Sequence, residues 1–85
     1  MFVMGHIDTC LNILHRLIAK GDVNAIPLAE RAINEYWDAA PVQARETGLR
    51  FVQQVVIELR DALTGDHHNF AETVNTYIEK KLGAE

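Results

Sequence analysis

The side chains best suited to metal chemistry lie near the start of the chain and in its last quarter. His6 and Cys10 are four residues apart, so a helix would carry both on one face, and both residue types bind zinc. A structural zinc site needs four ligands, and only these two lie near each other. A free cysteine is also a frequent core residue. We therefore expect Cys10 to be buried by packing rather than bound to a metal.

A second cluster contains Asp66, His67, His68 and Glu72, of which the last two stand one helical turn apart. Carboxylate-bridged dimetal bundles need a Glu-x-x-His pair on each of two helices, and the chain contains no such pair. The pattern favours a helix start, with Asp66 as the N-cap and the histidines solvated in the first turn. Metal binding at this cluster is an open alternative, but we expect no metal and no cofactor.

Sequence motifs of catalysis do not occur in the chain. It contains no Gly-rich phosphate loop, no nucleophile elbow and no His-Glu-x-x-His motif. Asp8 and Glu72 are conceivable as paired acids, yet nothing in the sequence brings them together. We expect that the protein is not an enzyme and has no catalytic residues.

Glycine and proline divide the chain into four segments, and apolar residues recur in each segment at steps of three and four. Such periodicity is typical of amphipathic helices and leaves no segment with strand alternation. We expect an all-α fold, a compact four-helix bundle-like domain that spans residues 1–85. The predicted helices cover about residues 6–20, 24–39, 42–64 and 66–82.

Residues at the segment boundaries predict how the helices begin and end. Gly21 after Lys20 is typical of a left-handed helix stop that follows a final-turn cation. Asp22 and Asn24 are both good caps at the start of the second helix, and with Asn24 as the N-cap Pro27 falls in the first turn. Pro41 leaves two alternatives open: a sharp corner between the second and third helices, or one kinked rod.

Composition limits the partners and the compartment. The 85 residues include 12 acids and 8 bases, a formal net charge of −4, which argues against nucleic acid and anionic membranes as default partners. Cys10 is the single cysteine, so no intrachain disulfide can form. A reducing, cytoplasmic location is expected, because the chain start lacks a signal-peptide pattern and no apolar run is long enough to span a membrane.

The apolar side of the third segment is wider than one neighbouring helix would bury. Its seam comprises Leu49, Val52, Val56, Leu59 and Leu63, and beside it run Ala44, Phe51, Val55 and Ala62. Gly48 near this side predicts a close approach of another backbone or a bend. We expect a homodimer whose interface contains Phe51, Val52, Val55 and Leu59, since small helical chains often complete their cores by self-association.

A small dimeric DNA-binding regulator, such as a repressor or antitoxin, is the first alternative. Residues 19–24 resemble the turn of a helix-turn-helix, and the next helix would then read DNA. Its first turn, residues 24–28, contains no arginine or lysine, and the eight bases are spread over all four helices. Nucleic acid is therefore an unlikely partner on this sequence.

The expected function is that of an acidic all-α module that binds another protein, as a regulator, adaptor or inhibitor of a larger assembly. The acidic side of the second helix carries Glu30, Glu35 and Asp38, which could steer toward a basic surface. Trp37 is either an aromatic anchor for this partner or a core residue, and the core is the simpler interpretation. A metal- or ligand-binding bundle is the second alternative.

Overall fold

A computed structural model of the chain describes residues 4–83, and within this range it contains helices and no strand. The elements are α1 (Met4–Lys20), the short 3-10 helix η1 (Val23–Ala25), α2 (Ile26–Ala39), α3 (Val42–Ala62) and α4 (Gly65–Gly83). The predicted all-α fold with four long helices is confirmed. No helix between residues 4 and 83 combines the length and apolar character needed to cross a bilayer.

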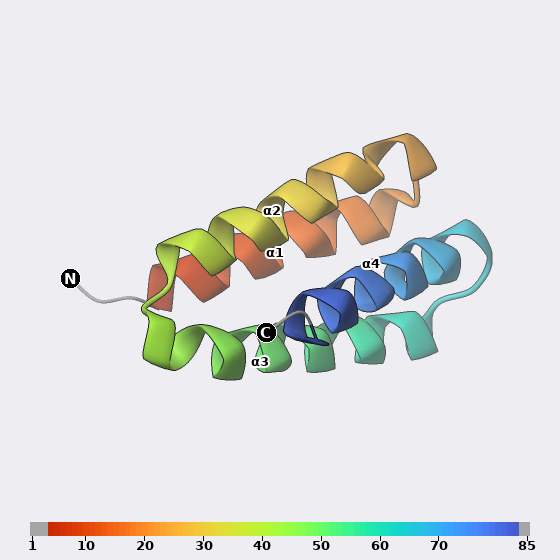
Figure 1. The fold of residues 1–85 in the computed structure, drawn as a ribbon. Coiled ribbons are helices and arrows are strands. Elements are labelled where there is room, and N and C mark those ends of the chain that lie inside the picture. Colours follow the sequence, from red (N-terminus) through yellow and green to blue (C-terminus); the bar gives the residue numbers. More distant parts are fainter. Residues whose placement is uncertain (1–3, 84–85) are drawn as a thin grey trace.

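The four long helices form two antiparallel hairpins that pack on each other (Figure 1). α1 pairs with α2 and α3 pairs with α4, because the short connections keep sequential helices adjacent. The hairpins meet through α1–α3, α2–α4 and α1–α4 contacts. α3 packs much more closely on α4 than on α1, so its two flanks are unequally covered.

The first connection confirms one boundary prediction and corrects another. Gly21 has φ of 67° and its N–H donates to the carbonyl oxygen of Leu17 at 3.0 Å, the expected left-handed stop of α1. The capping side chain that follows is Asp22, whose Oδ1 accepts from the N–H of Asn24 at 3.0 Å. Of the two predicted caps, Asp22 thus caps η1, whereas Asn24 lies inside η1 and is not the N-cap of α2, which is Ala25.

The connection between α2 and α3 is a sharp corner rather than a kink in one rod. Ala40 and Pro41 are both extended, with ψ of 146° and 142°. Two consecutive extended residues redirect the chain, and Pro41 then begins α3 as its N-cap residue.

The last connection lies slightly earlier in the chain than predicted. α4 begins at Gly65, whose φ is 62°, so Asp66 lies inside the first turn and is not the N-cap. An acid in the first turn still interacts favourably with the helix dipole. Gly65 therefore opens α4, while α3 already ends at Ala62.

The core lies between the two hairpins and takes residues from every long helix. Its completely covered side chains include Ile33, Leu49, Val52, Val56, Phe70 and Ile78, each 0% exposed. The large apolar side chains left exposed within the described residues are Val23, Leu28, Val42 and Phe51. A single copy of the chain therefore buries most of the predicted apolar sides.

Gly48 marks the closest approach between α2 and α3. A Cβ at this position would overlap the hydroxyl of Tyr36 and would lie 3.0 Å from its Cζ and 3.4 Å from Cδ1 of Ile7. The predicted close approach is thus made by a side chain, not by a backbone. Tyr36 itself is 5% exposed, and burial raises the pKa of its hydroxyl.

We predict that Gly48→Ala destabilises the protein, although alanine is the better helix former by about 1 kcal/mol. The added methyl group forces Tyr36 out of its place, and overpacking of this kind costs about 1–3 kcal/mol. Urea unfolding measures the change. Tyr36→Phe removes the hydroxyl, so Gly48→Ala should cost less in that background. A Gly48→Ala protein as stable as the wild type would show that the contact is not tight.

Candidate functional site

The adjacent histidines of α4 bind the ends of two other helices. His67 Nδ1 lies 3.0 Å from the carbonyl oxygen of Ile18 in the last turn of α1, and His68 Nδ1 lies 2.7 Å from that of Arg60 in α3. A carbonyl oxygen can only accept, so Nδ1 carries the proton in both rings. Both side chains are half-buried, and the prediction that they are solvated is wrong. His67 caps the end of α1, where the last carbonyls have no donor within the helix, and His68 adds a donor to the Arg60 carbonyl, which also accepts from the N–H of Leu63.

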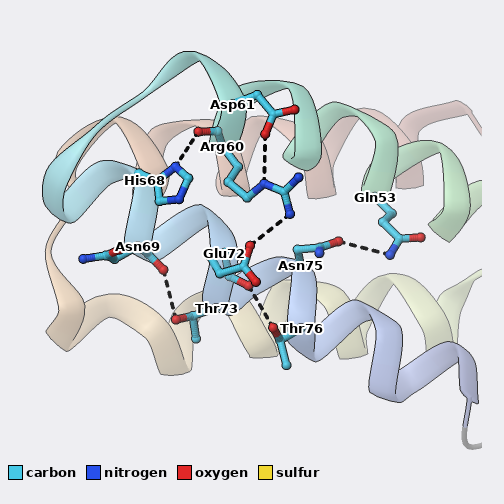
Figure 2. A network of polar contacts seen from close by, with 9 residues as sticks. All are labelled: Gln53, Arg60, Asp61, His68, Asn69, Glu72, Thr73, Asn75 and Thr76. Atoms are coloured by element: carbon cyan, nitrogen blue, oxygen red, sulfur yellow. Dashed lines mark hydrogen bonds and ion pairs between the residues drawn. The ribbon is translucent and has the colours of Figure 1, made fainter.

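Glu72 is directed toward an arginine. Arg60 Nη1 donates to its Oε1 at 3.0 Å, and Arg60 Nε donates to Asp61 Oδ1 at 3.1 Å. Figure 2 shows the Arg60 guanidinium between these two carboxylates. It also shows the His68 ring hydrogen-bonded to the main-chain carbonyl of Arg60. The hydrogen bonds to Glu72 and Asp61 raise the pKa of Arg60. The cluster therefore ties α3 to α4.

A second polar contact lies farther along the same pair of helices. Gln53 Nε2 donates to Oδ1 of Asn75 at 3.1 Å, and Asn75 is only 6% exposed (Figure 2). A buried amide is tolerated where its polar atoms find partners. Between α2 and α4, Asn34 Nδ2 donates to the hydroxyl of Tyr77 at 2.8 Å. These bonds fix how α4 sits on its neighbours.

His6 and Cys10 do not form a site with the later histidines. Cys10 is 2% exposed at the base of a pocket of about 230 Å³ between α1 and α2, so its predicted burial is confirmed. His6 is exposed at the start of α1, whereas His67 contacts the opposite end of that helix. Among residues 4–83, no group of three or more His, Cys, Asp or Glu side chains could hold a metal ion.

The acids predicted to meet a partner lie on the surface of α2. Glu35 and Asp38 are exposed, and Glu35 Oε2 accepts from Nε of Arg31 at 3.0 Å. Glu30 is half-buried at a groove between α2 and α4 that Glu72 also lines. An exposed pair one turn apart contributes little to stability, so the acids are not required by the fold.

Trp37 belongs to the core and is not available to a partner. It is 5% exposed, and its ring is covered by the guanidinium of Arg45 at 4.7 Å and the ammonium of Lys81 at 5.9 Å from the ring centroid. These cation–π contacts bring α3 and α4 onto α2. The structure therefore supports the interpretation of Trp37 as a core residue.

The residues predicted for a dimer interface separate into two groups. Phe51 is 55% exposed, and Val55 and Leu59 are half-buried. Val52 is 0% exposed in the core, so it cannot line an interface between folded copies. The reason is that adjacent helical residues point about 100° apart, which turns Val52 inward when Phe51 faces out.

An apolar pocket of about 250 Å³ opens beside Phe51. Ile7 of α1 and Tyr36 of α2 contribute to its wall, together with Ala44, Gly48 and Phe51 of α3. The small side chain of Ala44 does not fill this space. We call Phe51 and this pocket the Phe51 patch. Sequence reasoning did not find the pocket, because three helices form it and periodicity describes one helix at a time.

The first hairpin does not have the geometry of a DNA-reading motif. α1 and α2 lie side by side and antiparallel along their length (Figure 1), whereas the two helices of a helix-turn-helix cross at roughly 90–120°. The start of α2 is a chain corner with Leu28 exposed. An αα-hairpin is the better description.

No known protein family matches the chain, and no similar curated protein or solved structure was found. The function is therefore inferred from the side chains of this chain alone.

The buried thiol gives a prediction for alkaline pH. Burial raises the pKa of Cys10 from 9.0 to about 11, so above pH 9 the unfolded chain loses the proton that the folded chain keeps. Stability is complete below pH 9 and falls as the pH approaches 11, by about 2–3 kcal/mol from this group. Urea unfolding between pH 7 and 11 should show a shallower fall for Cys10→Ala. Parallel curves would mean that the thiol ionises equally in both states.

Proposed function

We propose that the chain is a non-catalytic protein–protein interaction module of the cytoplasm, which self-associates as a homodimer and regulates, adapts or inhibits a larger assembly. The observation that carries the proposal is the Phe51 patch: a large aromatic side chain, 55% exposed, beside an apolar pocket. Contiguous apolar surface of this kind marks interaction sites in small proteins.

The patch extends along two helices. Leu11 follows Ile7 by one turn of α1 and is half-buried, and Val55 follows Phe51 by one turn of α3. Both residues are partly covered, and α1 packs on α3 less closely than α4 does. A single exposed apolar side chain needs no explanation, but apolar side chains around a pocket favour a binding surface.

The acids of α2 supply a second surface. Glu35 and Asp38 are exposed on the outer side of α2, so association through the α1–α3 side leaves them accessible. A partner with a basic surface would be attracted to them, because complementary charge speeds encounter and excludes wrong partners. The cytoplasm is proposed because the lone cysteine is a buried free thiol.

We predict that sedimentation equilibrium gives twice the chain mass and that Phe51→Asp shifts the protein to monomer. In the dimer interface, a carboxylate at this position would be buried without a polar partner. Leu28→Asp is the matched control, since Leu28 is 52% exposed but lies on α2, away from the patch. It should leave the mass unchanged. A wild-type protein that is strictly monomeric at tens of micromolar would contradict the homodimer.

We predict that reversing Glu30, Glu35 and Asp38 to lysine leaves folding intact and abolishes binding to the partner. Each substitution adds two charges, so the formal net charge moves from −4 to +2. The control reverses three acids of α3 and α4, Glu46, Asp66 and Glu79, with the same change in net charge. Urea unfolding checks the fold, and capture from the lysate of producing cells checks the partner.

The expected partner is retained by the wild type and by the control but is lost by the α2 variant. If all three proteins retain the partner, the acids of α2 do not take part in binding it. The same proteins can be mixed with random duplex DNA at low salt. Binding to DNA that weakens steeply with salt would replace the proposal by the DNA-binding alternative.

A further inference from the structure

The Phe51 patch contains both a projecting ring and a space that admits one. Phe51 is 55% exposed, and the adjacent pocket has a volume of about 250 Å³. An apolar cavity of about 150 Å³ is large enough to bind benzene, so the pocket can take a phenyl ring. Its walls at Ile7, Ala44 and Gly48 offer apolar contacts.

A surface with a ring and a ring-sized pocket side by side is complementary to itself. In a two-fold dimer the same patch is used by both copies, so each residue's contact occurs twice. A two-fold axis perpendicular to α3, level with the turn between Gly48 and Phe51, would make the two α3 helices antiparallel. Each Phe51 would then lie opposite the Thr47–Gly48 turn of the other copy, where the pocket opens.

The same register places a carboxylate at the N-terminus of a helix. Glu58 follows Phe51 by seven residues, which returns it to within about 20° of the same side of α3. In the antiparallel pair it faces the Ala40–Pro41 end of the partner's α3. That helix start has no side-chain cap and no acid in its first turn, so it favours a carboxylate. Glu58 is exposed and has no polar partner among the residues that the structure describes.

A stable interface requires more area than Phe51 and its pocket provide. A stable interface buries about 800 Å² on each partner, which is about 15% of the 5273 Å² surface of this chain. One ring in one pocket does not supply that area. The interface must therefore also include Leu11 and Val55, the half-buried residues that extend the patch.

We propose that the pocket beside Phe51 is the docking site for Phe51 of a second copy of this chain, with Glu58 of each copy at the start of α3 of the other. The inference rests on the proposed self-association and specifies its geometry. The two contacts are reciprocal, so each copy supplies one ring and one pocket.

Two variants test the reciprocity. Phe51→Ala removes the ring and keeps most of the pocket, whereas Ala44→Trp covers the pocket and keeps the ring. Both positions are exposed, and urea unfolding of each variant checks that the fold is retained. Sedimentation equilibrium then gives Kd for the wild type, for each variant and for their equimolar mixture.

We expect each variant to dimerise at least about 30-fold more weakly than the wild type, as for loss of an interface anchor. The mixture should form a heterodimer at least about fivefold tighter than either variant alone, because the ring of Ala44→Trp can enter the pocket of Phe51→Ala. Glu58→Gln should weaken the dimer and reduce its salt dependence, whereas Glu79→Gln, on α4, should do neither.

A wild-type dimer that neither variant weakens would overturn this geometry and leave only the self-association standing. Two weakened variants without a tighter mixture would show that Phe51 does not enter the partner's pocket. A monomeric wild type would overturn both the geometry and the self-association on which it rests.

Discussion

The structure depends on how the wide apolar side of α3 is shared among its neighbours. Leu49, Val52 and Val56 are completely buried, and α4 covers one flank of the helix closely. α1 covers the other flank only loosely, although Phe51 and Val55 lie there. Three neighbouring helices cannot cover every side of a helix whose apolar residues spread so widely. On the side of α3 that faces α1, Phe51 stays exposed and Val55 half-buried, while Val42 at the start of α3 is exposed as well. The close packing of α3 on α4 and the looser packing of α1 on α3 therefore leave the surface that we propose for association.

The two hairpins are fastened to each other at opposite ends by different chemistry. At the corner between α2 and α3, the side chain of Tyr36 occupies the space that a side chain at position 48 would need. At the far end, His67 of α4 donates to the carbonyl oxygen of Ile18 in the last turn of α1. The first contact between the hairpins is steric, and the second is a hydrogen bond to a carbonyl group at the end of a helix. Gly48 also lines the pocket beside Phe51, so packing of the core and the proposed binding surface share one residue.

The sequence predicted the elements better than their contacts. Periodicity located all four helices and most of the core, because a helix must place its apolar residues on one side whatever it packs against. The Gly21 stop was predictable since a left-handed residue after a final-turn lysine has a local cause. The histidine contacts were not, because their acceptors lie 49 and 8 residues away and no local pattern identifies them. Val52 was wrongly assigned to an interface, because the apolar side of one helix does not show which of its residues another helix of the same chain will cover. Of the candidate surface, Phe51 was found from sequence, and the pocket beside it was visible only in three dimensions.

We propose that a second copy of the chain covers the Phe51 patch. Isotope-filtered NMR on a mixture of labelled and unlabelled chains observes this most directly, since only contacts between copies give a signal. We expect signals between the ring protons of Phe51 in one copy and the methyl group of Ala44 in the other. Signals between copies that arise instead at Leu28, or no signal at all at concentrations where the dimer should form, would contradict the account.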